Sequence, residues 1–206
     1  MLPASDPATL VEAVAILRQG GLVVFPTDTV YGVGAHAFLP QAVERLYIVK
    51  ERPRDKAIPL LLGSTSDVEQ VARDVPALAF TLMGRFWPGG LTIVLWARPH
   101  VPDIVTAGSG SVAVRLPDHA VPRALAAALG APLAATSANL SGQPSPRTAA
   151  EAASDLSGRV ELIIDGGPCP GGVESTVVDL TKHPPVIVRL GAISAEELSE
   201  WLRAAR

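Results

Sequence analysis

Two hydrophobic patterns alternate along this chain. In the first, apolar residues recur every three or four positions, as at residues 10–17, which predicts a helix. Asp6 provides its cap and Pro7 its first-turn proline, and the glycines at 20–21 mark its end. In the second, a short run is apolar throughout, as in Leu-Val-Val-Phe at 22–25, which predicts a buried strand. Both patterns return several times, so the chain is expected to alternate helices with strands.

Applied to the whole chain, these patterns predict most of its elements. The last strands follow one another without a helix between them, which favours a mixed sheet over a purely parallel one. The sequence therefore predicts an α/β fold with one mixed sheet of about seven strands, covered by helices. Further helices are expected at 40–50, 76–86, 121–129 and 148–157, and after the capping boxes Ser66-Asp67-Val68-Glu69 and Ser194-Ala195-Glu196-Glu197. Further strands are expected at 58–62, 91–96, 112–116, 132–136, 160–164, 176–180 and 186–190.

Composition narrows the class of protein. With 206 residues, 48% of them hydrophobic and 18% charged, the chain is expected to form a well-packed globule. No linker, repeat or low-complexity segment divides it, so a single domain over 1–206 is expected. No apolar run approaches the ~20 residues that span a membrane, and the N-terminus lacks a signal-peptide pattern. Cys169 is the single cysteine, which excludes an internal disulfide and suits a reducing cytoplasm, the expected location.

Positive charge is concentrated in one short segment. The formal net charge is −3, so the chain as a whole is not expected to bind nucleic acid electrostatically. Two of its three lysines, Lys50 and Lys56, nevertheless lie with Arg52 and Arg54 within seven residues. Lysine and arginine both suit phosphate oxygens, the first as a compact charge and the second as a planar fork. The cluster indicates either a polyphosphate site or a solvated basic turn.

The common catalytic signatures are missing from the sequence. There is no phosphate-binding Gly-x-x-x-x-Gly-Lys-Ser/Thr loop, no Gly-x-Gly-x-x-Gly after a strand and no Gly-x-Ser-x-Gly elbow. The four histidines and the single cysteine have no ligand spacing, so a structural zinc site is not expected. A P-loop nucleotide site, an ordinary dinucleotide site and a hydrolase of the elbow type are therefore disfavoured.

Small polar residues instead follow several of the predicted strands. They occur beside glycines at 26–32, 136–142, 166–176 and 189–191. Glycine lets a backbone approach a ligand closely, and ligands collect at strand ends in open α/β sheets. Any one of these segments could be a well-capped turn. Together with the basic cluster, they favour a ligand site.

Six ordered motifs carry a resemblance to a known family. The chain resembles the YrdC family of threonylcarbamoyl-AMP synthases over about residues 8–195, in its short, single-domain (TsaC) type. The resemblance implies a three-layer YrdC-like fold around a twisted mixed sheet with a basic concave face. The motifs are Pro-Thr-Asp-Thr-Val-Tyr-Gly-Val-Gly at 26–34, Lys-x-Arg-Pro at 50–53, Trp-Pro-Gly at 87–89, Val-Ala-Val-Arg-Leu-Pro at 112–117, Ser-Ala-Asn-x-Ser-Gly at 137–142 and Glu-Ser-Thr-Val at 174–177.

The resemblance implies an L-threonylcarbamoyladenylate synthase. Its substrates would be ATP, L-threonine and bicarbonate or CO2, its products threonylcarbamoyl-AMP and pyrophosphate, and Mg2+ would accompany the nucleotide. The product would serve the threonylcarbamoyl modification of the adenosine 3′ of the tRNA anticodon, through downstream transfer proteins. Such a reaction needs positioning and charge neutralisation rather than a protein nucleophile, which fits the missing catalytic signatures.

The family motifs also imply residue roles. Lys50 and Arg52 would stabilise charge, no protein nucleophile or protein metal ligand is assigned, and Arg115 could equally pair an anionic group or anchor its strand end. One departure concerns 58–63, Ile-Pro-Leu-Leu-Leu-Gly, where longer family members have a histidine near threonine and this chain has none. The implied ATP-binding residues are Lys50, Arg52, Lys56, Ser137, Asn139 and Arg189, and the implied threonine-binding residues are Thr29, Ser175 and Arg115.

Two other functions compete with the synthase. A basic concave face could hold tRNA or double-stranded RNA without chemistry, although single-stranded RNA recognition usually uses exposed aromatic residues and this chain has nine aromatics, most of them in apolar patterns. A paralogue of the same fold could act on another substrate, although the intact motif at 26–32 argues against it.

Overall fold

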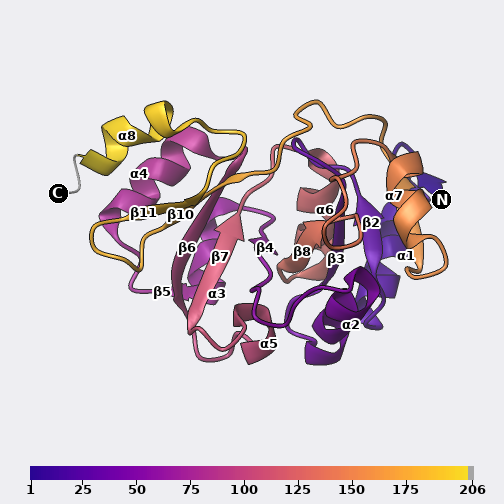
Figure 1. Cartoon of the computed structure of the whole chain (residues 1–206). Helices are drawn as coiled ribbons and strands as arrows, with labels where there is room; N and C mark the ends of the chain where they lie inside the picture. Colours follow the sequence, from indigo (N-terminus) through magenta and orange to yellow (C-terminus); the bar gives the residue numbers. More distant parts are fainter. Residues whose placement is uncertain (204–206) are drawn as a thin grey trace.

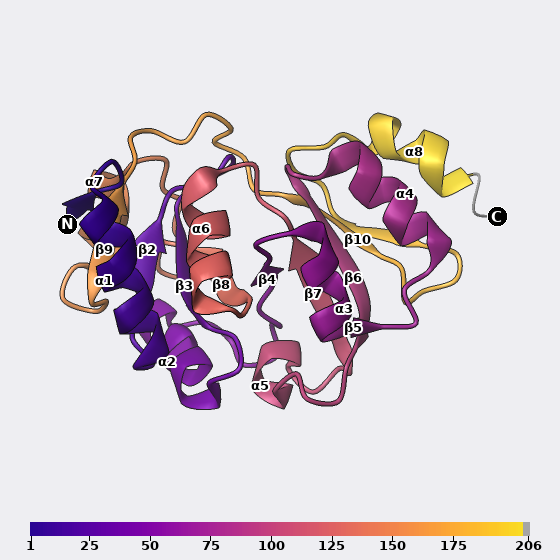
Figure 2. The same cartoon turned by 180° about the vertical axis from the view of Figure 1, so that it is seen from behind.

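The computed structural model describes residues 1–203, in which helices cover a large twisted sheet (Figures 1 and 2). The helices are α1 (Pro7–Arg18), α2 (Pro40–Lys50), α3 (Val68–Val71), α4 (Ala77–Phe86), α5 (Asp103–Thr106), α6 (Ala120–Leu129), α7 (Ala149–Leu156) and α8 (Ala195–Arg203), with a 3-10 helix at Thr65–Asp67. The strands are β1 (Leu2–Pro3), β2 (Val23–Phe25), β3 (Gly32–His36), β4 (Leu60–Leu61), β5 (Ala72–Arg73), β6 (Leu91–Ala97), β7 (Ser111–Arg115), β8 (Leu133–Ser137), β9 (Leu162–Asp165), β10 (Thr176–Asp179) and β11 (Val186–Arg189).

The sheet is mixed, as predicted, but the predicted number of about seven strands is wrong. Eleven strands pair over residues 1–203, in the order β1-β9-β2-β3-β8-β4-β7-β6-β10-β11, and β5 pairs with the end of β6 outside this order. The pairs β1–β9, β2–β9, β4–β7 and β6–β10 are parallel, and the other pairs are antiparallel. The extra strands are β1 and β5, which have two residues each, and the glycine-rich β3.

Two local predictions also need correction. The apolar run at 58–62 contributes only Leu60 and Leu61 to the sheet, because Pro59 lacks the backbone N–H that a ladder uses. The predicted capping box at Ser66 does not form. Instead Asp67 Oδ2 accepts from the backbone N–H of Ser64 (2.8 Å), and the helix begins as the 3-10 turn followed by the single turn α3.

Alternation along the strands separates the two faces of the sheet. Val23 and Phe25 on β2 pack into a core beneath α1 and α6, whereas Val24 packs into a larger core that includes residues of α2 and α7. Figure 1 shows α2 and α7 on one face, and Figure 2, from behind, shows α1 and α6 on the other. The half of the sheet formed by β9, β2, β3 and β8 therefore has helices on both faces, which makes three layers. None of the described helices is long and apolar enough to cross a bilayer.

The other half of the sheet is covered on one side. Helix α4 lies across the face of β6 that is seen in Figure 2, and Leu91, Ile93 and Leu95 point into the core there. Figure 1 shows the opposite face of β6 and β7 without a helix in front of it. Thr92 of β6 and Arg115 of β7 are on that open side, where they line a cleft. The two-residue strand β4 lies between β8 and β7, so it joins the two halves next to this cleft.

Candidate ligand-binding cleft

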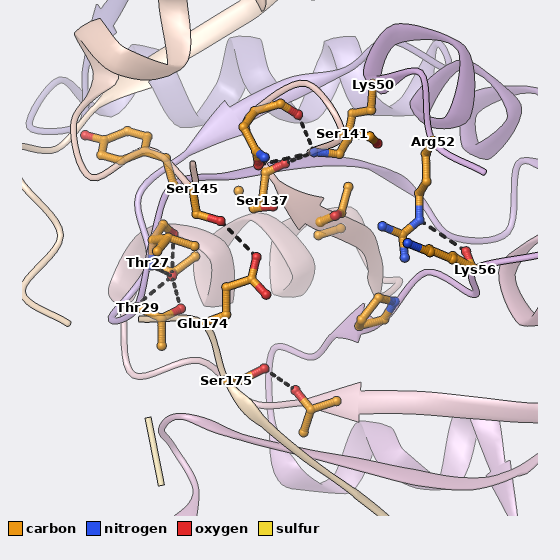
Figure 3. Close-up of a pocket in the computed structure, with 18 of the residues that line it drawn as sticks. Thr27, Thr29, Lys50, Arg52, Lys56, Ser137, Ser141, Ser145, Glu174 and Ser175 are labelled. Atoms are coloured by element: carbon orange, nitrogen blue, oxygen red, sulfur yellow. Dashed lines mark hydrogen bonds between the residues drawn. The ribbon is translucent and has the colours of Figure 1, made fainter. Parts of the chain in front are cut away.

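A cleft of ≈ 390 Å³ lies where the two halves of the sheet meet. Its walls come from strand ends and from the loops that follow them, the place where open α/β sheets bind ligands. Figure 3 shows side chains from both halves pointing toward one another across it. All nine residues that were predicted to bind ATP or threonine line this cleft: Thr29, Lys50, Arg52, Lys56, Arg115, Ser137, Asn139, Ser175 and Arg189.

Lys50 is buried at the end of α2, with 2% of its surface exposed. Its Nζ donates hydrogen bonds to the backbone carbonyl oxygens of Ser137 and Asn139, and lies 3.5 Å from Asn139 Oδ1. Burial, with the nearby charge of Arg52 acting in the same direction, lowers the pKa of Lys50 from 10.5 to about 8. The ammonium group therefore holds the loop after β8 directly, a contact that the phosphate prediction did not include.

The loop after β8 is further fixed by its own side chains. Asn139 Nδ2 donates to the carbonyl oxygens of Leu140 (2.9 Å) and Gln143 (2.6 Å), and the backbone N–H of Ser141 donates to the carbonyl oxygen of Lys50 (2.9 Å). The hydroxyl of Ser137 makes no hydrogen bond among residues 1–203 and lines the cleft. Ser137 therefore offers a side chain to a ligand, while Asn139 mainly shapes the loop.

Arg52 and Lys56 line the same wall of the cleft (Figure 3). The Arg52 guanidinium donates through Nε to the carbonyl oxygen of Lys56 (3.1 Å) and through Nη2 to that of Ala57 (2.8 Å). Burial lowers the pKa of Arg52, but an arginine stays protonated in proteins. Arg52 is thus tied to the backbone of its own segment, whereas residues 53–56 are exposed.

Arg115 anchors the end of β7, one of the alternatives left open by the sequence. Its Nη2 pairs with Asp28 Oδ1 (2.6 Å), its Nη1 donates to Thr29 Oγ1 (3.0 Å) and its Nε donates to the carbonyl oxygen of Gly89 (2.9 Å). Burial lowers the pKa of Arg115, while the carboxylate of Asp28 opposes that effect. Three of the five N–H groups of the guanidinium are used in this way, so two are left for a ligand.

Two hydroxyl pairs lie beside Arg115. Thr29 Oγ1 is 3.0 Å from Thr27 Oγ1, and Thr27 in turn donates to the carbonyl oxygen of Val30 (2.7 Å), so the turn after β2 is held by its own threonines. Ser175 Oγ is 2.8 Å from Thr92 Oγ1 on β6. Because Thr27 gives its proton to Val30, Thr29 donates to Thr27 and can offer a ligand only an acceptor lone pair, whereas the Ser175–Thr92 pair keeps one proton for a ligand. Thr27 and Thr92 were not predicted as site residues, and Thr27 could have been found from its place in the motif at 26–34.

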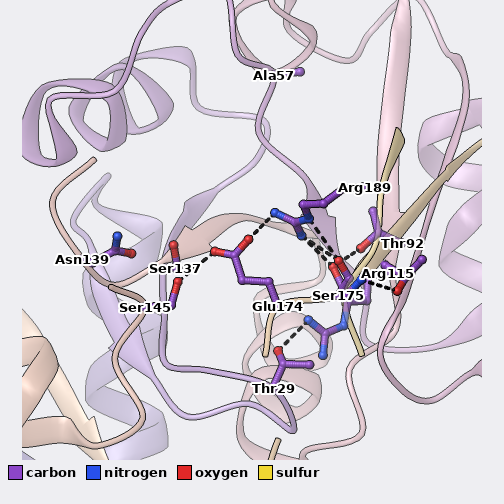
Figure 4. Close-up of polar contacts among 12 residues, drawn as sticks. Thr29, Ala57, Thr92, Arg115, Ser137, Asn139, Ser145, Glu174, Ser175 and Arg189 are labelled. Atoms are coloured by element: carbon purple, nitrogen blue, oxygen red, sulfur yellow. Dashed lines mark hydrogen bonds and ion pairs between the residues drawn. The ribbon is translucent and has the colours of Figure 1, made fainter. Parts of the chain in front are cut away.

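Arg189 and Glu174, which both line the cleft, form an ion pair (Figure 4). Arg189 Nη1 pairs with Glu174 Oε2, and its Nη2 donates to the carbonyl oxygen (2.9 Å) and Oγ (3.2 Å) of Ser175. Ser145 donates to Glu174 Oε1 (2.9 Å) from the opposite wall. A Cβ on Gly191 would overlap the carbonyl oxygen of Glu174, so a glycine is required for this close approach. Glu174 and Ser145 were missed as site residues, although Glu174 opens a motif that the sequence displays.

The histidines contribute nothing to the cleft as it is described. Neither His36 nor His119 is among the residues that line it, and burial lowers the pKa of both. Over residues 1–203, no group of three or more His, Cys, Asp or Glu side chains could hold a metal ion.

Five cationic side chains and a set of hydroxyl and amide groups converge on a cleft at the strand ends of an α/β sheet, an arrangement typical of sites for small anionic ligands. The chain belongs to the Sua5/YciO/YrdC family, whose model is described as "Telomere recombination" and matches residues 15–191. The resemblance predicted from the six motifs is thereby confirmed.

The chain is similar over most of its length to one curated relative and to two solved structures. It is 45% identical over 194 residues to a threonylcarbamoyl-AMP synthase of Pyrococcus abyssi (strain GE5 / Orsay), covering 94% of this chain and 57% of that protein. The crystal structure of P. abyssi Sua5 complexed with L-threonine matches with a TM-score of 0.91 and 44% identity, over 93% of this chain and 56% of that one. E. coli YciO matches with a TM-score of 0.85 and 30% identity, over 95% of both chains. The chain thus spans little more than half the length of the P. abyssi relatives.

Proposed function

We propose that this chain is an L-threonylcarbamoyladenylate synthase, which converts ATP, L-threonine and bicarbonate or CO2 into threonylcarbamoyl-AMP and pyrophosphate. The observation that carries the proposal is that seven residues from five separate motifs converge on a single cleft with Lys56 and with Arg189 of β11. Names of relatives support it, since the P. abyssi protein is a threonylcarbamoyl-AMP synthase and P. abyssi Sua5 has been crystallised with L-threonine.

The two walls of the cleft suit the two larger substrates. Arg52, Lys56 and the hydroxyl of Ser137 lie on the wall formed by α2, β8 and their loops, where they would bind the phosphates of ATP. Lys50 would act there mainly by holding the loop after β8 in place. Arg189, from the opposite wall, would reach the nucleotide. Threonine would bind among the four hydroxyl side chains beside Arg115, with its carboxylate toward the Arg115 guanidinium. These side chains belong to Thr27, Thr29, Thr92 and Ser175.

The reaction then needs no protein nucleophile. The threonine ammonium and bicarbonate combine to the carbamate, R–NH3+ + HCO3− giving R–NH–CO2− + H2O + H+. A carbamate oxygen attacks the α-phosphorus of ATP, and the bond from that phosphorus to the bridging oxygen breaks to release pyrophosphate. Fixed cations around the phosphates stabilise the charge that develops, and the rigid walls hold the reacting atoms in line.

Magnesium would enter with the nucleotide. The described residues offer no cluster of carboxylates for it, which fits an ion held by phosphate oxygens and water, as Mg2+ commonly is in nucleotide sites. When bound, the ion would neutralise phosphate charge. The product adenylate would pass to tRNA threonylcarbamoyl-transfer proteins, with tRNA as the final acceptor.

Mass spectrometry tests this proposal directly. Purified protein is incubated with ATP, L-threonine and ¹³C-bicarbonate, and each substrate is omitted in turn. Threonylcarbamoyl-AMP that carries the ¹³C label, together with pyrophosphate, is expected only in the complete mixture. Binding of tRNA without any adenylate would instead favour the RNA-binding module, and an adenylate of another amine would favour a paralogue with a different substrate.

A further inference from the structure

Glu174 is the one carboxylate among the described residues that line the cleft. Its neighbours there are cationic: Lys50, Arg52, Lys56, Arg115 and Arg189 also line it. One carboxylate oxygen accepts from Ser145 on one wall, and the other pairs with Arg189 on the opposite wall (Figure 4). The side chain therefore stands between the two walls, with 35% of its surface exposed to the cleft and solvent.

A carboxylate at this position is unfavourable for a site that binds only phosphate. It repels the phosphate oxygens of ATP, and it neutralises part of the positive charge that would attract them. Glu174 also opposes the lowering of the pKa of Lys50 and Arg52 by burial, so it lies near enough to influence both cations. Glu174 pairs with Arg189, but its partly exposed carboxylate can also attract a positive group on a ligand.

The proposed threonine pocket lacks a partner for one of the three polar groups of its ligand. Arg115 suits the carboxylate, and the Ser175–Thr92 hydroxyl pair suits the hydroxyl. The α-ammonium group needs an acceptor, preferably a charged one.

Glu174 is next to Ser175 in the chain, and one guanidinium, that of Arg189, bonds both Glu174 Oε2 and Ser175 Oγ. The Arg189 guanidinium therefore bridges the Glu174 carboxylate and the Ser175–Thr92 hydroxyl pair. Each carboxylate oxygen of Glu174 accepts one hydrogen bond, from Ser145 or from Arg189, so each keeps acceptor capacity for a further donor in the cleft.

We propose, on the basis of the proposed function, that Glu174 binds the α-ammonium group of threonine and so selects an amino acid over a simple hydroxy acid. Carbamate formation removes the positive charge of the nitrogen. The attraction of Glu174 is then lost, and the anionic carbamate is repelled toward the cationic wall where ATP would bind. The same residue thus favours entry of the amino acid and release of its carbamate toward the nucleotide.

The test compares two ligands rather than two activities. Isothermal titration calorimetry measures the affinity of wild type, Glu174→Gln and Glu174→Ala for L-threonine and for 3-hydroxybutanoate, which keeps the carboxylate and the hydroxyl but lacks the amine. Wild type is expected to prefer threonine by at least about tenfold, the effect of one charge-assisted hydrogen bond. Both variants should lose that preference, because their affinity for threonine falls and that for 3-hydroxybutanoate does not.

Affinity for MgATP, measured on the same samples, shows whether the cleft is intact. It should stay the same or increase in both variants, because a negative charge has been removed. Glu12→Gln, at an exposed carboxylate on α1, serves as the matched control and should behave like wild type. An unchanged ligand preference in Glu174→Ala would overturn the proposal, and so would a loss of MgATP affinity with the preference retained, which would place Glu174 with the nucleotide. Absence of threonine binding by wild type would instead overturn the proposed function itself.

Discussion

The ammonium group of Lys50, the last residue of α2, donates a hydrogen bond to the carbonyl oxygen of Ser137, the last residue of β8. The two residues are 87 positions apart in the chain. The buried ammonium group therefore fixes the loop after β8 while Lys50 also lines the cleft. One residue of the basic cluster thus helps to shape the cleft.

Replacing Lys50 by methionine should loosen the loop after β8. The variant keeps the length of the side chain and removes all its donors, so amide hydrogen exchange over residues 137–143 should accelerate and ATP affinity should fall by at least about tenfold. Global stability should change little, because removing a desolvated charge offsets the lost hydrogen bonds. Lys182→Met, at an exposed lysine, is the control. Lost ATP affinity with unchanged exchange in the loop would show that Lys50 acts on phosphate alone.

The lowered pKa of Lys50 predicts a pH dependence of stability. Burial brings this pKa from 10.5 to about 8 in the folded protein. Between these values the unfolded chain binds more protons than the folded one, so the contribution of Lys50 to stability rises with pH. The cost of its charge is therefore fully present below about pH 8 and disappears above 10.5. Denaturant unfolding of wild type and Lys50→Met should give a difference in free energy that shifts in favour of wild type from pH 8 toward pH 10. A constant difference would contradict a buried ammonium group.

Alanine at positions 137 and 139 should have different effects. Ser137→Ala removes a hydroxyl without a described partner, so ATP affinity should fall by about tenfold or more while the melting temperature stays near that of wild type. Asn139→Ala removes two hydrogen bonds within its loop, so it should lower both ATP affinity and stability, the latter by ~1–2 kcal/mol. Calorimetric binding and thermal unfolding measure the two effects. Equal melting temperatures for the two variants would contradict the role assigned to Asn139.

Asp28→Ala should destabilise the fold, because it leaves the guanidinium of Arg115 buried without its carboxylate. Removing one partner of a buried ion pair typically costs ~3–5 kcal/mol, and we expect the lower end because Asp28 is 15% exposed. Denaturant unfolding measures the loss. Glu44→Gln, which removes the partner of the exposed Arg54, should cost much less. Comparable losses in the two variants would mean that the Asp28–Arg115 pair is not effectively buried.

Substrate selection should follow the hydroxyl groups of the proposed threonine pocket. Valine has the shape of threonine without its hydroxyl, so it should form adenylate with a kcat/KM lower by at least about a hundredfold, since buried hydroxyls are left unpaired. Serine lacks only a methyl group and should lose about fourfold. Initial rates of pyrophosphate release with the three amino acids measure both ratios. Similar rates for threonine and valine would exclude the pocket.

Hydrophobic pattern predicted the larger elements well. The helices expected at 40–50, 76–86, 121–129 and 148–157 are found within one residue at each end. Strand β3 was not predicted because Gly32 and Gly34 interrupt its apolar pattern, yet Phe25 packs where a Cβ on Gly34 would lie. Strands β1 and β5 have two residues each, too few for any periodicity, and form because a longer strand is already present beside them.

The members of the site were predictable from motifs, but several of their contacts were not. Each motif shows which polar residues follow a strand, whereas the pairing of Lys50 with the loop after β8, or of Arg115 with Asp28, joins residues more than 80 positions apart. Such partners depend on which strands become neighbours in the sheet. Glu174 was visible in its motif, but its significance depends on the five cations around it, which only the fold brings together.

The order of the sheet has a consequence for synthesis on the ribosome. Strand β2, near the beginning of the chain, has β9 as its parallel neighbour, with Val23 opposite Leu162. Arg189 reaches the cleft only after β11 has paired with β10. Pairing across such separations slows folding, because a long loop must close before the contacts reward it. A nascent chain can therefore form its early helices and hairpins as it emerges from the ribosome. The two walls of the cleft can come together only after the residues up to β11 have also emerged.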